Sequence, residues 1–295
     1  MNLRDLQYLV AVADHLHFGK AAEYCHVSQP TLSMQLKKLE ERLGVQLIER
    51  SNKHVLFTSI GQDITTRARR ILNEAEHIKT VAANARDPLS GDLRLGIFPT
   101  LAPYLLPRIM PSLHQALPAL NLLLVEEKTD LLLQLLQRGT LDAAMLALPI
   151  TQEGVMTQAL FTEPFLLAVP ASHPLATRQT VDYESLQDIT LLLLDEGHCL
   201  REQALDICRA IGTGEARHFR ATSLETLRHM VAAGNAVTLM PALAALPNPA
   251  IVYIPFAESP PARTIGLCWR DMSARYILFS RLGTCITDSV VPQLD

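Results

Sequence analysis

The segment from Ser28 to Leu43, SQPTLSMQLKKLEERL, constrains the fold of the N-terminal part more than any other stretch of the chain. Its leucines recur at the spacing that puts them on one face of a helix: Leu32, Leu36, Leu39 and Leu43. Ser28 suits the N-cap, where its hydroxyl can accept a backbone N–H, and Pro30 suits the first turn because no donor is needed there. The segment therefore predicts an amphipathic helix with a buried leucine face and an exposed polar face.

Two shorter helices are predicted before this one, at residues 3–15 and 18–25, and only His26 and Val27 separate the second of them from Ser28. Helices joined by so short a connection have the form of a helix-turn-helix, in which the start of the second helix enters the major groove of DNA. There, Gln and Ser can exchange hydrogen bonds with base edges, and Lys can contact phosphates. A helical hairpin with a solvated polar face is the alternative, and the pattern alone favours the two about equally.

Residues 45–61, VQLIERSNKHVLFTSIG, alternate enough to predict a small β-hairpin whose tip carries two cations suited to the DNA backbone. The candidate DNA-binding residues are Ser28, Gln29, Pro30, Thr31, Ser33, Gln35, Lys37, Arg50 and Lys53. The first 87 residues hold twelve Lys or Arg against ten Asp or Glu, whereas the remainder holds fourteen against twenty. A mildly basic N-terminal part followed by an acidic remainder agrees with a nucleic-acid partner for residues 1–87.

Residues 18–61 resemble the winged helix-turn-helix of LysR-type transcriptional regulators. The matching motifs are Ser-Gln-Pro at 28–30, Leu-Glu at 39–40, Leu-Gly at 43–44, Leu-Ile-Glu-Arg at 47–50 and Thr-x-x-Gly at 58–61. This resemblance implies that residues 1–60 form a DNA-binding domain and that double-stranded operator DNA is a partner.

A polar helix is predicted after the hairpin, and in it Ile64, Ile71 and Ile78 recur every seven residues with alanines between them. Such a strip suits a coiled-coil seam, because small alanines allow two helices to approach closely. LysR-type regulators are similar in having a dimerisation helix here. The run DPLSG at 87–91 marks a linker, so residues 61–90 are predicted to form the dimerisation helix and a hinge.

The composition bounds the class of protein. Hydrophobic residues make up 48% of the 295 residues and charged residues 19%, which excludes extensive disorder and allows two or three units with real cores. Charges at Arg4, Asp5 and Asp14 are unlike a secretory signal peptide, and the most apolar long stretch, 230–256, is broken by glycine and prolines. We therefore expect a cytoplasmic protein with no membrane association, whose five cysteines are reduced at rest.

Beyond the hinge, apolar strands alternate with helices, in the order LRLGIF, 101–117, LNLLLVEE, 130–137 and DAAMLAL. This βαβαβ pattern implies a parallel sheet, and ligands of such sheets bind at the carboxyl ends of the strands. Thr100 and Thr129 fall at two of those ends, although either could simply cap a helix.

The predicted fold is multidomain: an all-α winged helix-turn-helix domain with a long linker helix, followed by a two-lobed α/β regulatory domain. This last part, residues 91–295, resembles the periplasmic-binding-protein-like sensor half of LysR-type regulators. Lobe I is predicted to comprise 91–160 and 266–295, and lobe II 161–265.

The segment 195–208, DEGHCLREQALDIC, holds two of the five cysteines in a setting that favours chemistry. An apolar stripe at helical spacing predicts a helix that begins at Cys199, beside His198 and two residues before Arg201. Free N–H groups at a helix start and nearby positive charge would lower the pKa of the Cys199 thiol. Cys208 falls near the buried stripe, roughly 13 Å further along the axis, whereas a disulfide needs Cα atoms within about 7 Å. The two thiols could join only if the helix unwound or shifted.

Two other interpretations of these cysteines stay open. A cysteine on an apolar helix face is most often inert core packing, and this suits Cys208 taken alone. A zinc site made of His198, Cys199, Cys208 and His218 is a poorer match, because its spacing lacks the usual paired pattern. We therefore expect no metal and no cofactor.

Within the LysR-type family, GHCLREQALDIC, HFRATSLETLRHMVAAG and TLMPALA are closely similar to the peroxide-sensing members. The resemblance implies that Cys199 is the peroxidatic cysteine, that Cys208 resolves it as a disulfide, and that oxidation activates oxidative-stress genes. It also implies a peroxide pocket made of Thr100, Thr129, His198, His218 and Phe219. Hydrogen peroxide, a homo-oligomer arranged as a dimer of dimers, and RNA polymerase are the further partners that it suggests.

Three other functions would each account for part of the sequence. A LysR-type regulator could instead sense a small anionic metabolite in the cleft between the lobes, with the cysteines as bystanders. A two-cysteine peroxidase would share the chemistry of Cys199 but would have no use for residues 1–60, so we expect a protein that is not an enzyme. A solute-binding protein would have two lobes, but that role requires a signal peptide.

Overall fold

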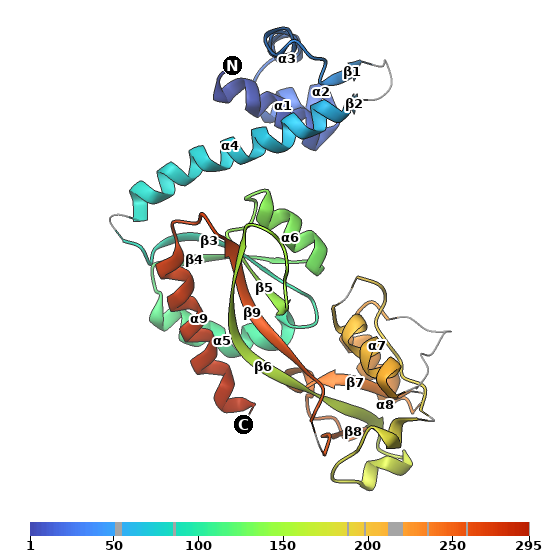
Figure 1. The fold of residues 1–295 in the computed structure, drawn as a ribbon. Coiled ribbons are helices and arrows are strands. Elements are labelled where there is room, and N and C mark those ends of the chain that lie inside the picture. Colours follow the sequence, from blue (N-terminus) through green and yellow to red (C-terminus); the bar gives the residue numbers. More distant parts are fainter. Residues whose placement is uncertain are drawn as a thin grey trace. The chain divides into compact units, whose positions relative to one another are not determined.

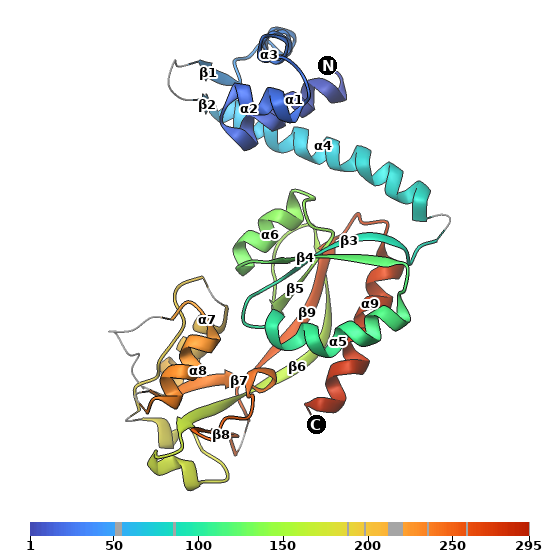
Figure 2. The same ribbon diagram turned by 180° about the vertical axis from the view of Figure 1, so that it is seen from behind.

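The computed structural model describes residues 1–50, 55–84, 87–187, 189–197, 199–211, 221–234, 236–257 and 259–294. The chain divides into two compact units, Met1–Arg86 and Asp87–Asp295. Figures 1 and 2 show the elements of each unit from opposite sides. None of the helices in the described part of the chain combines the length and the apolar character that crossing a bilayer requires.

The first unit has the winged helix-turn-helix that the sequence predicts. Its elements are α1 (Leu3–His15), α2 (Phe18–Tyr24), α3 (Gln29–Leu43), the antiparallel pair β1 (Ile48–Arg50) and β2 (Val55–Phe57), and α4 (Ser59–Asn84). Ser28 caps α3 by accepting the N–H of Thr31, and Gly44 ends it in a left-handed conformation at φ 69°. Leu32, Leu36 and Leu39 are buried, as their spacing predicts.

The helix α4 packs against its own unit over its first half. Ala68 is buried and Ile64 and Leu72 are partly buried against the core of α1 to α3, whereas Ile71 and Ile78 are exposed. Ile64 and Ala68, which belong to the predicted dimerisation seam, therefore pack within their own chain. The exposed isoleucines are what remains for a partner helix.

The second unit is built on a mixed seven-stranded sheet, within the residues described, of order β4-β3-β5-β9-β6-β7, with β8 also paired to β6. The predicted βαβαβ pattern forms its parallel part: β3 (Gly91–Ile97), α5 (Ala102–Ala116), β4 (Leu120–Glu126), α6 (Thr129–Gln137) and β5 (Ala143–Leu148). The antiparallel part comprises β6 (Val155–Pro170), β7 (Thr238–Pro241), β8 (Ile251–Ile254) and β9 (Ala262–Arg270). The helix α8 (Leu224–Ala232) packs against β6 and β7, α7 (Cys199–Ile211) lies at the same end of the unit, and α9 (Tyr276–Val290) packs with α5 (Figure 1). Short 3-10 turns lie at Pro174–Thr177, Glu184–Leu186, Ala242–Ala244 and Val291–Gln293.

The strand β6 crosses the position at which the sequence suggests that lobe II begins. It runs without a linker through Phe161, with a register shift between Ala159 and Phe161, and changes partner from β9 to β7 and β8. The strand β9 accompanies it antiparallel over Val155–Pro164. Two long paired strands, and not a flexible linker, therefore connect the two ends of this unit (Figure 2).

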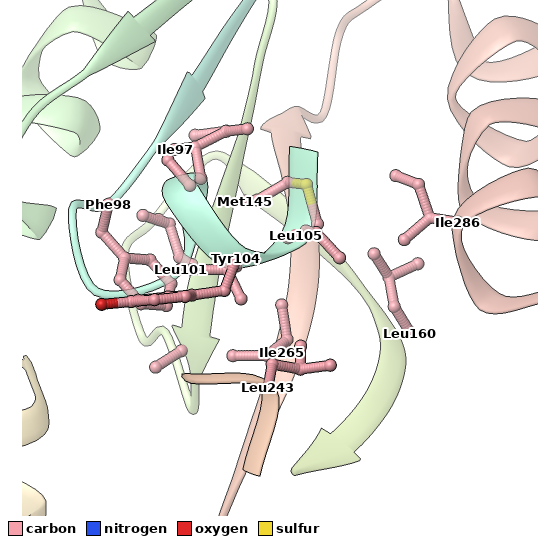
Figure 3. Packing of buried hydrophobic residues seen from close by; sticks show 14 of the residues in the cluster. Ile97, Phe98, Leu101, Tyr104, Leu105, Met145, Leu160, Leu243, Ile265 and Ile286 are labelled. Carbon is pink, nitrogen blue, oxygen red and sulfur yellow. The ribbon is translucent and has the colours of Figure 1, made fainter. Parts of the chain in front are cut away.

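Two hydrophobic clusters fill the unit. The larger surrounds α5 and α9 and includes Ile97, Phe98, Leu105, Met145 and Ile265, as Figure 3 shows. The smaller lies at the far end of β6 and includes Leu167, Val169, Leu193, Ala204 and Cys208.

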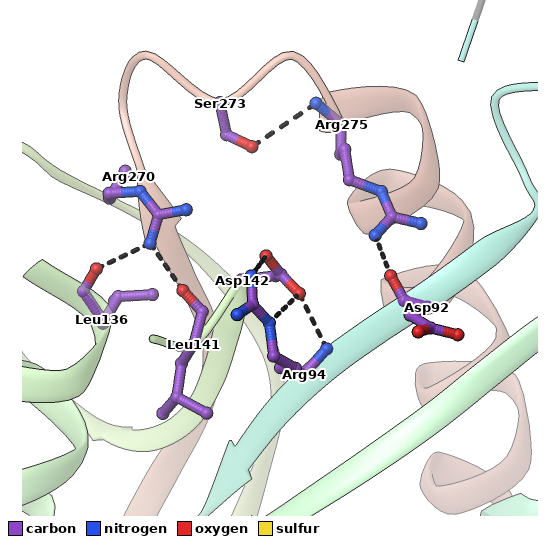
Figure 4. A network of polar contacts seen from close by, with 8 residues as sticks. All are labelled: Asp92, Arg94, Leu136, Leu141, Asp142, Arg270, Ser273 and Arg275. Carbon is purple, nitrogen blue, oxygen red and sulfur yellow. Dashed lines mark hydrogen bonds and ion pairs between the residues drawn. The ribbon is translucent and has the colours of Figure 1, made fainter. Parts of the chain in front are cut away.

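Three arginines lie at the end of the larger cluster next to the hinge: the exposed Arg94, the partly buried Arg270 and the buried Arg275. Figure 4 shows Arg94 paired with Asp142, Arg270 donating to the carbonyl oxygens of Leu136 and Leu141, and Arg275 donating to that of Asp92. Arg275 also donates to the carbonyl of Ser90, at 3.0 Å, and burial lowers the pKa of its guanidinium, with Asp142 opposing the shift. The two bonds of Arg275 therefore attach the segment around Ser90 to the turn between β9 and α9.

Candidate redox site

Cys199 is the first residue of α7, where the backbone N–H groups of a helix have no partner within the helix. Its thiol is partly buried and packs against the larger hydrophobic cluster. Cys208 lies nine residues on, in the same helix, but its buried side chain belongs to the smaller cluster. All five cysteines are free thiols. The continuous helix therefore keeps the two sulfurs apart, because nine residues advance roughly 13 Å along its axis.

The pKa of Cys199 differs in direction from the sequence-based prediction. Burial raises the pKa of this thiol, because removal from water penalises the charged form. The charge of Arg263, the hydroxyl of Thr129 and the N–H groups of Leu200 and Cys199 itself act in the opposite direction. The predicted helix-end effect is present, but the predicted lowering of the pKa is wrong because desolvation outweighs it.

The cation near Cys199 is also not the one that the sequence indicates. Arg201 is buried, and it donates from Nη1 to the carbonyl of Leu194 at 2.9 Å. Arg263, at the start of β9, supplies the positive charge that favours the Cys199 thiolate. No local pattern indicates Arg263, because it lies 64 positions after Cys199 in the sequence.

Arg263 is held from every side by groups from distant parts of the chain. Its Nε donates to Glu163 Oε2 at 2.7 Å, and both side chains are fully buried. The second carboxylate oxygen of Glu163 accepts the N–H of Leu243 at 2.7 Å. The guanidinium also lies over the rings of Phe98 and Phe165, 5.3 Å and 6.0 Å from their centroids. A buried charge needs this degree of pairing and hydrogen bonding to be tolerated.

The two threonines expected at strand ends both lie near this charge or the thiol. Thr100, fully buried after β3, accepts Arg263 Nη1 on its hydroxyl at 3.0 Å and Nη2 on its carbonyl at 3.1 Å. Thr129 begins α6, and its buried hydroxyl oxygen has no hydrogen bond of ordinary geometry among the residues described. The Cys199 sulfur is the group to which this hydroxyl can donate, which favours the thiolate.

The remaining candidates of the peroxide pocket, His198, His218 and Phe219, lie outside the described residues. Sequence reasoning missed Arg263 and Glu163. It also missed Gln203, one turn after Cys199 on α7, whose Oε1 is buried without a hydrogen-bond partner among the described residues. Within that part of the chain, no group of three or more His, Cys, Asp or Glu side chains is arranged to hold a metal ion.

The candidate DNA-binding residues divide by what their side chains do. Ser28 and Thr31 bond to one another through their hydroxyls at 2.8 Å and form the cap of α3. The remaining candidates on α3 are exposed or partly exposed: Gln29, Pro30, Ser33, Gln35 and Lys37. Arg50 ends β1, but its side chain lies outside the described part of the structure, as does the whole of Lys53.

Comparisons with known proteins agree with both units. The model of the bacterial regulatory helix-turn-helix protein, lysR family, matches residues 3–62, and that of the LysR substrate binding domain matches residues 86–282. The chain is 48% identical to the DNA-binding transcriptional dual regulator OxyR of Escherichia coli K12, over 97% of this chain and 95% of that protein. It is 44% identical to the hydrogen peroxide-inducible genes activator of Haemophilus influenzae, over 100% of this chain and 99% of that protein. A solved full-length OxyR variant from Pseudomonas aeruginosa has a TM-score of 0.80 and 39% identity, over 99% of both chains.

Proposed function

Because the chain belongs to the LysR family of bacterial transcription regulators, we propose that it is a DNA-binding activator that senses hydrogen peroxide through Cys199 and Cys208. The observation that carries the proposal is the position of Cys199, at the start of a helix and next to the buried charge of Arg263. The relatives named as peroxide-responsive regulators span almost the whole chain, which supports the same function. The relatives are regulators and not enzymes, which disfavours a peroxidase.

The first step is attack of the Cys199 thiolate on one oxygen of the peroxide. An S–O bond forms as the O–O bond breaks, the sulfur gives up two electrons, and the leaving hydroxide takes a proton to become water. Thr100, Thr129, His198, His218 and Phe219 are the residues that we propose hold the peroxide. In the second step the Cys208 thiolate attacks the sulfenic sulfur, an S–S bond forms, and the oxygen leaves as water.

The second step requires α7 to open, because its two cysteines pack in different clusters. Opening would expose Leu200 and Ala204, which are 3% and 2% exposed. Their burial is worth a few kcal/mol, on the order of the 2 to 4 kcal/mol usually assigned to a disulfide. A reversible switch needs a near balance of this kind, and oxidation would then change the arrangement of subunits in a homo-oligomer.

The test is peptide mapping of peroxide-treated full-length protein without reductant, combined with hydrogen exchange over residues 199–211. We expect a Cys199–Cys208 peptide and faster exchange in α7 of the oxidised protein. Cys199→Ser and Cys208→Ser should abolish the peptide, and Cys268→Ser, which alters a fully buried thiol in β9, should preserve it. Cys199 paired with another cysteine, or a disulfide with unchanged exchange in α7, would contradict the switch.

The DNA-binding part of the proposal predicts different effects for α3 residues. Replacing Gln29 or Ser33 by Ala should relax base preference, because these side chains lie where a helix-turn-helix reads the major groove. Replacing Lys37 by Gln should mainly reduce affinity and its dependence on salt. Selection of genomic fragments by each variant, followed by footprinting, measures both effects. The footprint of the parent should cover half-sites related by two-fold symmetry, as a symmetric homo-oligomer such as a dimer of dimers requires. Contact with RNA polymerase completes the activator role that we propose.

The runner-up, a sensor of small anionic metabolites, is less well supported. A pocket beside the ends of β3 and β4 is lined by Glu126, Glu127 and Glu225, of which Glu225 pairs with Arg228, and by one lysine, Lys128. Such a lining repels an anion, and we therefore do not propose this function.

A further inference from the structure

A pocket of about 370 Å³ lies beside the strand ends that lead to the candidate redox site. It is bounded by the segment after β3, the end of β4 and the start of α8. The residues that line it are Pro99, Pro103, Tyr104, Glu126, Glu127, Lys128, Thr222, Ser223, Leu224 and Glu225. Pro99 and Lys128 directly precede the two threonines near Cys199 and Arg263.

The side chain of Lys128 connects this pocket with the segment that precedes Cys199. Its Nζ donates to the carbonyl of Glu196 at 2.7 Å. Its Cδ lies 3.1 Å from the position that a Cβ on Gly197 would occupy, so the lysine stem covers this glycine. The pocket therefore adjoins the turn from which α7 and its first residue, Cys199, begin.

Three glutamates and one lysine line the pocket, and the charge of one glutamate, Glu225, is balanced by Arg228. With Arg228 included, the formal net charge is −1. Glu225 is occupied by an ion pair with Arg228 and by a hydrogen bond from Tyr104 at 2.7 Å. Glu126 is exposed and Glu127 is partly exposed, and neither has an ion-pair partner within the residues that the structure describes. Because Glu225 is paired with Arg228, Glu126 and Glu127 give the pocket its acidic character.

The electrostatic surroundings of Cys199 therefore change sign with depth. Arg263 favours negative charge at the Cys199 sulfur, so it would also favour an anionic oxidant, such as hypochlorite or peroxymonosulfate, that comes next to the thiol. An acidic rim opposes that approach and leaves the access of uncharged hydrogen peroxide unchanged. Without the acidic rim, the charge of Arg263 would make Cys199 less selective for uncharged hydrogen peroxide over anionic oxidants.

We propose that this pocket is the entrance to Cys199 and that Glu126 and Glu127 make it selective for uncharged oxidants over anionic ones. The proposal builds on Cys199 as the reacting thiol. Its test needs neither DNA nor disulfide formation, so a failure of the selectivity and a failure of the peroxide switch can be told apart.

The test compares two alkylating agents of similar size, the uncharged iodoacetamide and the anionic iodoacetate, on the reduced full-length protein. Both react with the same thiolate, which forms an S–C bond as the C–I bond breaks and iodide leaves. The ratio of the two rates therefore cancels the fraction of thiolate and reports access by charge. Mass spectrometry of the peptide containing Cys199 measures each rate separately from the other cysteines.

We expect the rate ratio of iodoacetamide to iodoacetate at Cys199 to exceed that of glutathione. The Glu126→Gln/Glu127→Gln protein should lower the ratio about fourfold at low salt, which is the effect of two unit charges at a distance of about 10 Å in water. Glu153→Gln removes one carboxylate from an exposed position outside the pocket and should leave the ratio unchanged. In the parent, salt on the order of 1 M should lower the ratio towards that of the double variant by screening the charges.

Two results would overturn the proposal: a parent ratio no higher than that of glutathione, or a ratio that the double variant leaves unchanged. If the double variant folds poorly, the salt dependence of the rate ratio in the parent tests the proposal instead, and a ratio that salt leaves unchanged would overturn it. A second measurement uses hydrogen peroxide against peroxymonosulfate, in which an S–O bond forms, the O–O bond breaks and sulfate leaves. The double variant should gain rate selectively with peroxymonosulfate, and an equal change with both oxidants would contradict selection by charge.

Discussion

At the scale of single residues, the chemistry of Cys199 depends on a balance between burial and charge. Burial raises the pKa of the thiol, and Arg263 is the largest of the influences that lower it. The arginine can stay charged at this depth because Glu163 pairs with it and because Thr100 accepts two of its N–H groups. Reactivity at this position is therefore set by three residues that lie far from Cys199 in the sequence.

The pH dependence of alkylation at Cys199 should reflect this balance. Since the pKa of the thiol is raised, the thiolate is scarce at neutral pH, and the rate with iodoacetamide should keep rising to a midpoint above that of an exposed thiol. Arg263→Met combined with Glu163→Gln should move the midpoint still higher, because the charge that lowers the pKa is lost. The combined change is used because Arg263→Met alone would leave a buried carboxylate without its partner.

A matched control is the pair Arg94→Met and Asp142→Asn, which removes another arginine–carboxylate pair at the opposite end of the same sheet. It should leave the pH midpoint of Cys199 unchanged. A midpoint that falls, or stays the same, in the Arg263 variant would contradict the role given to that charge.

At the scale of elements, local patterns predicted what local forces determine. The leucine spacing and the Ser28 cap gave α3, and alternating apolar runs gave the βαβαβ part, because periodicity reports which face of an element is buried. The single strand β6 was not predicted, because its alternation continues while its partners change from β9 to β7 and β8. Nor could Arg263 and Glu163 be identified, since pairing across 100 residues leaves no local signal.

The contact between the wing and α4 depends on Gly61. A Cβ at this position would lie 2.0 Å from the carbonyl oxygen of Leu47, a backbone atom that cannot move without shifting the wing. Gly61→Ala should therefore destabilise the first unit by about 3 kcal/mol, the upper end of the usual range for overpacking. Hydrogen exchange of peptides from α1 to α3 measures this change in the full-length protein.

Gly44→Ala is the matched control for that measurement. A Cβ at Gly44 meets no atom within 4 Å, so only the left-handed conformation at φ 69° opposes it. This costs about 1 to 2 kcal/mol. If the two variants exchanged at equal rates, the close approach at Gly61 would not limit the stability of the unit.

At the scale of the whole molecule, the two units have separate cores. The core of the first unit is formed by α1 to α4 and the wing, and those of the second by residues from Asp87 onward. The chain has one tryptophan, Trp269, which packs against Phe279 with ring centroids 5.3 Å apart. Its fluorescence therefore reports on the second unit alone.

A fragment that begins at Asp87 should fold by itself and unfold in urea at the same midpoint as the second unit of the full-length protein. The reason is that the fragment keeps both of its hydrophobic clusters and the arginine bonds next to the hinge. Trp269 fluorescence is the measurement in both proteins. A fragment that unfolds at clearly lower urea would mean that the first unit contributes to the stability of the second.

The position of β9 has a consequence for synthesis on the ribosome. This strand, Ala262–Arg270, lies between β5 and β6, yet it is made after most of the chain has emerged. Until then the facing edges of β5 and β6 lack their partner, and an unpaired edge strand readily joins another chain. The DNA-binding unit, in contrast, draws its core from residues 6–72 and can fold early. A message truncated before codon 262 would therefore yield a folded DNA-binding unit attached to an incomplete second unit that is prone to aggregate.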